Sequence, residues 1–120
     1  MLSQIKKLRS DQFPAYILYM TFDPAKNIDN EKALTLIREA ATRNNLIYGG
    51  HVKQRMRERR FTIQDVLFIL QHGELSEKEY KEEYENWVYS IRGVDLEGEE
   101  GRVVTAIVSE YSIQIITVTS

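Results

Sequence analysis

WVYSIRGVDLEGEEGRVVTAIVSEYSIQIITVT, residues 87–119, carries the clearest secondary-structure pattern of this chain. Three short runs within it, WVYSIRG, RVVTAIVS and IQIITVT, are rich in β-branched and aromatic residues, which favour strands. Polar DLEGEEG and the tight EYS separate the runs, and none of the three contains proline. The pattern predicts a three-stranded antiparallel meander, with residues 93–101 as the long polar loop candidate.

The residues before this meander show helical patterns. In residues 29–44, Asp29 or Asn30 can cap a helix with one apolar stripe, formed by Ala33, Leu34, Ile37, Ala40 and Ala41. A short extended piece is expected at residues 46–48. Thr62 and Asp65 resemble a capping box for a later helix that Gly73 ends. Helices that precede strands without regular alternation predict an α+β fold, with N-terminal helices packed on a C-terminal antiparallel β-meander.

Two further segments are harder to assign. Residues 1–24 combine helical spacing of Leu2, Ile5 and Leu8 with the strand-like run AYILYMTF. The glutamate-rich residues 74–85, called the acidic tract below, suggest a solvated helix or an ordered loop. The chain as a whole is expected to form one domain, because 120 residues with 42% apolar content suffice for a single core.

Composition excludes several kinds of chemistry. The chain has no cysteine, so disulfides and thiolate nucleophiles are absent, and only two histidines stand at no metal-ligand spacing. We therefore predict no metal. No glycine-rich phosphate loop of Walker or Rossmann type is present, and we predict no cofactor. No apolar run approaches the roughly 18 residues that a membrane span needs, so we predict no membrane association and a cytoplasmic location.

Charge is unevenly distributed along the chain. HVKQRMRERR, residues 51–60, contains five Lys or Arg and one Glu, although the whole chain has a formal net charge of -2. The acidic tract holds six Glu and two Lys, and residues 95–100 hold four acids and no base. Such separation predicts one positive and one negative region, which bears on binding partners and not on the fold.

A helical wheel divides the basic decapeptide into two groups. The His51 group (His51, Arg55 and Arg59) shares an arc with Glu58 beside the apolar Val52 and Met56, and it is expected to border the core. The Lys53 group (Lys53, Arg57 and Arg60) points the other way, towards solvent.

The His51 group has two interpretations. In the structural one, its arginines and Glu58 form ion pairs that pin the helix to the acidic tract, with His51 as a cap. In the functional one, two guanidinium groups one turn apart bind a phosphodiester, and an imidazole that titrates near neutrality transfers a proton.

Other candidates have ordinary structural explanations. His72 precedes Gly73, where an imidazolium would interact favourably with a helix C-terminus. The aromatic residues Trp87, Tyr89 and Tyr111 could stack on bases, but alternating aromatics on strands are more often core or cross-strand partners.

The His51 group has the spacing H-x3-R-x3-R. It is followed by FTIQDV (residues 61–66), Gly73, a strand pair and the ending IITV (residues 115–118). This succession resembles a bacterial domain-of-unknown-function family grouped with RelE/ParE-like toxins of toxin–antitoxin modules. The resemblance covers roughly residues 46–119. It implies a RelE-like, toxin-type domain at residues 46–119, with residues 1–45 as an N-terminal extension that contains one long helix.

The resemblance also implies an activity, because relatives of that fold include metal-independent endoribonucleases and gyrase inhibitors. Carried over by position, His51 would transfer the proton, while Arg55 and Arg59 would bind the scissile phosphate. Arg92 and Arg102, on predicted strands, would be secondary binding residues, and the implied partners are RNA and a cognate antitoxin protein. The chain departs from such ribonucleases in being slightly acidic. The alternative is a non-catalytic module that docks an acidic partner protein through the basic helix.

Overall fold

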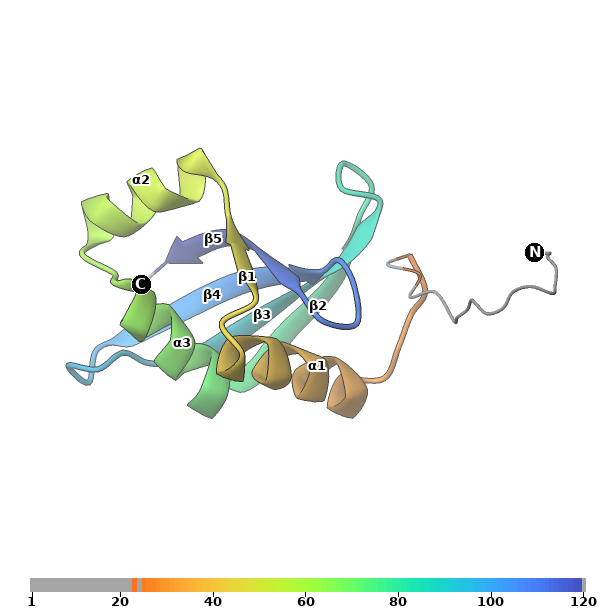
Figure 1. Cartoon of the computed structure of the whole chain (residues 1–120), viewed down its shortest axis with the longest axis horizontal. Helices are drawn as coiled ribbons and strands as arrows, with labels where there is room; N and C mark the ends of the chain where they lie inside the picture. Colours follow the sequence, from red (N-terminus) through yellow and green to blue (C-terminus); the bar gives the residue numbers. More distant parts are fainter. Residues whose placement is uncertain (1–22, 24, 120) are drawn as a thin grey trace, which may run out of the picture.

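The computed structural model describes residue 23 and residues 25–119, which form an α+β fold of three helices and a five-stranded sheet (Figure 1). The predictions for residues 1–22 lie outside the described residues. The elements in chain order are α1 (Asn30–Thr42), β1 (Leu46–Tyr48), α2 (Gly50–Arg59), α3 (Ile63–His72), β2 (Glu74–Lys81), β3 (Asn86–Val94), β4 (Glu100–Ile107) and β5 (Ile113–Thr119).

The strands lie in the order β1-β5-β4-β3-β2. The predicted three-stranded meander is present as β3, β4 and β5, which pair antiparallel. The loop between β3 and β4 spans residues 95–99 and is therefore shorter than predicted. At the far edge, β1 pairs parallel with β5, and this short strand is the extended piece expected before the basic segment.

The assignment of the acidic tract to a helix or loop was wrong, because residues 74–81 form the edge strand β2. A β-bulge between Leu75 and Glu77 explains the error. It shifts the register so that Leu75, Lys78 and Tyr80 pair with Ile91, Tyr89 and Trp87 on β3. The inward positions are therefore spaced by three and then by two residues, which hides the alternation typical of a strand.

The helix boundaries follow the predicted caps. The Asp29 side chain accepts a hydrogen bond of 2.8 Å from Lys32 N at the start of α1. Thr62 and Asp65 form the reciprocal capping box at the start of α3. By contrast, Gly49 gives α2 no side-chain cap, and α2 ends at Arg59, after which Arg60 has a left-handed φ of 61°.

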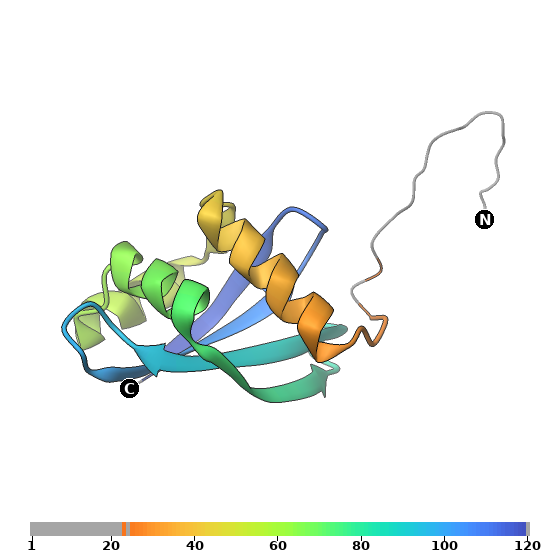
Figure 2. The ribbon, with the colours of Figure 1, turned by 90° about the horizontal axis from the view of Figure 1, so that it is seen from below.

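The core lies between the sheet and the helices, and Figure 2 shows α1 and α3 on one face of the sheet. Ile37 on α1, Ile69 and Leu70 on α3, and Ile91 and Val103 on the sheet are all fully buried there. Burial of each such side chain stabilises the folded state by about 1.5–3 kcal/mol, because its apolar surface is removed from water. The alternate residues Val88, Ser90 and Arg92 point to the opposite face of the sheet, on which none of the helices in the described residues packs.

Two side chains of the sheet donate hydrogen bonds to the segment at the start of α1. Lys78 Nζ donates to the Ile28 carbonyl oxygen at 2.7 Å and to Asn30 Oδ1 at 3.3 Å. Trp87 Nε1 donates to the Ala25 carbonyl oxygen at 3.1 Å. These bonds join residues that are far apart in sequence and fix the first turn of α1 against β2 and β3.

In the part of the chain that the structure describes, no helix combines the length and apolar character that crossing a membrane would require.

Candidate nucleic-acid interface

The basic decapeptide forms most of α2, which packs against β5 near one edge of the sheet. Val52 and Met56, one turn apart, are 4% and 6% exposed and belong to the same core as α1 and α3. The narrow apolar edge predicted for this helix is therefore confirmed. Because α2 covers only the edge of the sheet, most of its circumference remains in contact with water.

The three members of the His51 group differ in burial. Arg55 is half-buried, and its Nε atom is buried without a hydrogen-bond partner among the described residues. His51 and Arg59, in the first and last turns of α2, are exposed. The expectation that all three border the core is correct only for Arg55, because the contact with β5 covers a narrow line of side chains.

The Lys53 group is exposed throughout, as predicted. Arg57 and Arg59 lie in the last turn of α2, where positive charge interacts favourably with the helix dipole. Glu58, which the structural interpretation assigned to ion pairing, accepts a hydrogen bond of 3.1 Å from Gln54 Nε2 one turn earlier on the same helix. This contact lies along the surface of α2 and joins two residues of the same helix.

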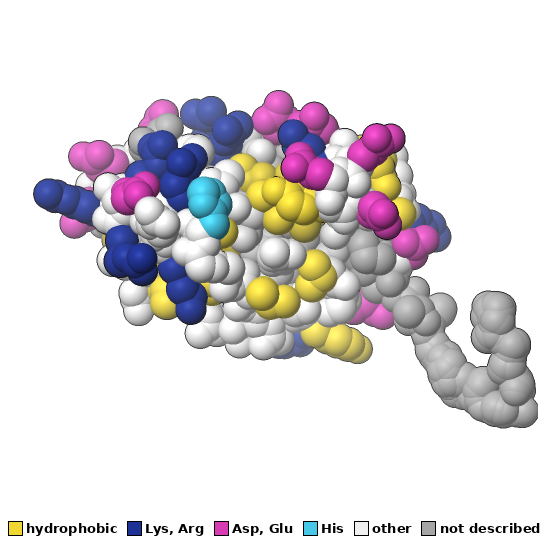
Figure 3. Space-filling view, turned by 90° about the horizontal axis from the view of Figure 1, so that it is seen from above, with side chains coloured by type: hydrophobic (Ala, Val, Ile, Leu, Met, Phe, Trp, Pro, Cys, Tyr) yellow, Lys and Arg dark blue, Asp and Glu magenta, His cyan; other side chains and the backbone are white. Residues whose placement is uncertain are grey.

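The sheet separates the basic helix from the acidic tract. α2 packs on β5, whereas β2 forms the opposite edge of the sheet, with β4 and β3 between them. In Figure 3, Lys and Arg side chains gather at the end of the face where Figure 1 draws α2, and most of the acidic side chains on view lie towards the other end. The interpretation in which the acidic tract pins this helix is therefore wrong, because the two segments lie on opposite edges.

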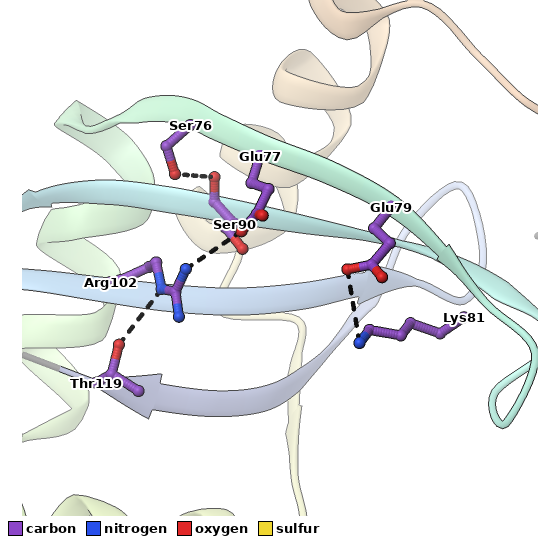
Figure 4. Close-up of polar contacts among 7 residues, drawn as sticks. All are labelled: Ser76, Glu77, Glu79, Lys81, Ser90, Arg102 and Thr119. Carbon is purple, nitrogen blue, oxygen red and sulfur yellow. Dashed lines mark hydrogen bonds and ion pairs between the residues drawn. The ribbon is translucent and has the colours of Figure 1, made fainter.

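Arg92 and Arg102 form a second, separate pair of arginines. They are Cα partners on β3 and β4, on the face of the sheet that carries no helix. Arg102 donates to Thr119 Oγ1 at 3.4 Å and pairs with Glu77 at 3.3 Å, as Figure 4 shows. Arg92 lies 3.8 Å from a Glu100 carboxylate oxygen. The structure thus brings these two arginines together but does not bring them to the His51 group.

The remaining sequence candidates are structural or peripheral. The His72 ring, at the end of α3, lies 4.5 Å from the Phe68 ring. Tyr89 is a core residue at 2% exposure, and Trp87 is engaged with Ala25, whereas Tyr111 is 66% exposed in the turn before β5. Within residue 23 and residues 25–119, no group of three His, Asp or Glu side chains is placed to hold a metal ion.

Sequence reasoning missed Tyr48, the last residue of β1. Its hydroxyl is buried without a hydrogen-bond partner among the described residues, and burial raises the pKa of Tyr48 to about 12. The alternation of Leu46, Ile47 and Tyr48 does contain a signal. Leu46 and Tyr48 pack against the core, while Ile47 is 49% exposed. A run of three residues is too short, however, to predict that a phenol will be buried beside the start of α2.

Comparison with known proteins assigns the chain to a family but gives that family no activity. A family model described as a domain of unknown function, DUF4258, matches residues 48–120. No curated protein and no solved structure matches the chain. The matched region begins at Tyr48 and takes in α2, α3 and the whole meander, which is more than half of the sequence. The chain therefore belongs to the DUF4258 family of domains of unknown function.

Proposed function

We propose that α2 binds the phosphate backbone of RNA and that the protein is a toxin-like, metal-independent endoribonuclease. The observation that carries this proposal is the exposure of the most basic segment of an acidic chain, on a helix that the sheet separates from the acidic tract. Charged side chains held in this way create a local positive potential that attracts a polyanion.

The spacing of the His51 group suits a chain of phosphates. Its members recur every four residues, so their Cα atoms rise about 6 Å per step along the helix. A guanidinium donates two parallel hydrogen bonds to phosphate oxygens. The half-buried stem of Arg55 restricts the positions of its head group, so less conformational entropy is lost when this side chain binds phosphate.

The proposed reaction is an intramolecular transesterification of RNA. The ribose 2′-oxygen attacks the adjacent phosphorus and the bond to the 5′-oxygen breaks, which leaves a 2′,3′-cyclic phosphate and a 5′-hydroxyl. His51 accepts the proton of the 2′-hydroxyl, and water supplies the proton that the leaving 5′-oxygen takes up. Arg55 and Arg59 offset the negative charge that develops on the phosphate oxygens.

RNA binding is tested with the full chain and a fluorescent single-stranded RNA, by fluorescence anisotropy in buffer that contains EDTA. Arg55→Ala and Arg59→Ala are each expected to weaken binding about tenfold, because each removes charge-assisted hydrogen bonds to phosphate. Raising the salt concentration should weaken binding of the unsubstituted chain as well. Lys32→Ala, which removes a cation from α1 instead of α2, is the matched control and should bind normally. A correctly folded chain that does not bind RNA at low salt would disprove the proposal.

Cleavage is tested separately on the same RNA, with products identified by mass spectrometry. His51→Ala is expected to bind RNA normally and to cleave it about 10² to 10⁴ times more slowly, because it lacks the proton acceptor. An oligonucleotide with 2′-deoxyribose should bind without being cut. If His51→Ala cleaves as fast as the unsubstituted chain, the assigned role of His51 is wrong. In cells, the same substitution should relieve the growth arrest expected on induction.

A second candidate function rests on the Lys53 group, which is exposed on the other side of α2. In this alternative the protein is a non-catalytic module that docks an acidic partner protein, such as a cognate antitoxin, through these cations. Binding would then be sensitive to salt and to Lys53→Ala, Arg57→Ala or Arg60→Ala, but indifferent to His51→Ala.

A further inference from the structure

The face of the sheet that carries no helix contains a hollow of about 240 Å³. Its floor includes Val88, Ser90 and Val104, which are buried at 5%, 6% and 9% exposure although no helix of the described residues covers them. Side chains from β2 and from the turn after it form one wall, and Arg102 on β4 and Thr117 on β5 line the other side. Figure 4 shows this face, with Glu77, Glu79 and Lys81 from β2 and Arg102 from β4.

The lining of this hollow suits a cation. Three carboxylates border it against two cationic side chains, and Glu77 and Glu79 already pair with Arg102 and Lys81 at 3.3 Å and 3.5 Å. Glu83 is exposed and forms no ion pair within the described residues, so one negative charge remains unmatched.

Two neutral groups of the hollow add features that a guanidinium or ammonium group can use. Tyr84, 46% exposed, offers an aromatic face. Thr117 Oγ1 is a buried oxygen without a hydrogen-bond partner among the described residues, and it can accept a bond.

The complementary cations are present on this same chain, but they cannot reach the hollow of their own molecule. The acidic tract has six Glu and two Lys, and the basic decapeptide has five Lys or Arg and one Glu, so their formal charges are equal and opposite. The lining of the hollow extends to Thr117 on β5, but α2 packs on the other face of the sheet, where Val52 and Met56 join the core. The sheet thus lies between α2 and the hollow of the same molecule, which leaves a second molecule to supply the cations.

We propose that the hollow on the helix-free face of one copy binds the Lys53 group on α2 of a second copy. One arginine or lysine head group enters between Glu79 and Glu83, over the ring of Tyr84, while the other cations face Glu77, the remaining carboxylate of the hollow. The contact joins two different surfaces, so it is heterologous, and copies add head to tail. RNA bound along α2 competes with this contact, because both use the same helix.

The first test is the mass of the full chain by sedimentation equilibrium at two salt concentrations. At about 50 mM salt the proposal expects species larger than a monomer, which dissociate at about 500 mM, where charges are screened within a few ångströms. A chain that is monomeric at high concentration in both buffers would overturn the proposal, whatever the outcome of the RNA experiments.

The decisive test uses two charge-reversed variants. Arg57→Glu with Arg60→Glu disables the helix surface, and Glu79→Lys with Glu83→Lys disables the hollow. Each double variant alone is expected to be monomeric at low salt. Mixed in equal amounts, they should associate, because the intact hollow of one variant can bind the intact α2 of the other. Failure of the mixture to associate would contradict the proposed pairing.

The matched control is Glu82→Lys with Glu85→Lys, which makes the same change of charge in the turn after β2 but outside the lining of the hollow. This variant should still associate. If it becomes monomeric as well, the association reflects overall charge and the hollow has no specific role. Glu79→Lys with Glu83→Lys leaves α2 intact, so its RNA binding should persist, which separates this proposal from the function proposed for α2.

Discussion

Gly73→Ala is expected to lower the free energy of unfolding by about 3 kcal/mol, a large effect for one added methyl group. A Cβ at this position would lie 2.6 Å from the Arg92 carbonyl oxygen and 2.7 Å from the Ile69 carbonyl oxygen. Both atoms belong to the backbone, so they cannot rotate away. Relief of the clash requires the end of α3 to move off β3, where Ile69 and Ile91 are fully buried.

Urea unfolding followed by circular dichroism measures this loss. Gly50→Ala is the matched control, because nothing lies within 4 Å of a Cβ at that position in the first turn of α2. It should be neutral or slightly stabilising, since alanine favours a helix by up to about 1 kcal/mol over glycine. A Gly73→Ala variant as stable as Gly50→Ala would show that the close packing of α3 on the sheet is not required.

Asp65→Ala is expected to cost about 2 kcal/mol at neutral pH. The Asp65 carboxylate accepts hydrogen bonds from Thr62 N at 2.9 Å and from Leu96 N at 3.1 Å, so it caps α3 and also holds the loop between β3 and β4. Burial by itself raises the pKa of Asp65, but the hydrogen bonds from Thr62 and Leu96 outweigh it and lower the pKa below its usual value.

This lowered pKa fixes how the contribution of Asp65 depends on pH. The charged form is favoured in the folded state, so the stabilisation is present above the unfolded pKa of about 3.9 and is lost as the pH falls through the lower folded pKa. Asp65→Asn keeps the shape but has only one acceptor oxygen. The difference in stability between the unsubstituted chain and Asp65→Asn, measured by urea unfolding, should therefore shrink as the pH falls below about 4. A difference that stays constant with pH would contradict the assignment.

The elements that depend on interactions between neighbouring residues could be predicted from the sequence. The stripe that includes Ala33 and Ile37, the capping box at Thr62 and the strands of the meander depend on local periodicity and local hydrogen bonds, and the structure has each of them. The strand β2 was missed, because its bulge interrupts the period of two that identifies a strand. Its pairing with β3, which lies further along the chain, supplies the backbone hydrogen bonds that decide its conformation.

The amino-acid order alone shows one strongly basic and one acidic segment, and its pattern predicts that His51, Arg55 and Arg59 recur along one helix. The places of these charges in space depend on the order of strands in the sheet, which follows from pairings between distant residues. That order places α2 and β2 towards opposite edges of the sheet and keeps Arg92 and Arg102 apart from the His51 group. The charges of the two edges are therefore available to other molecules instead of neutralising each other within one.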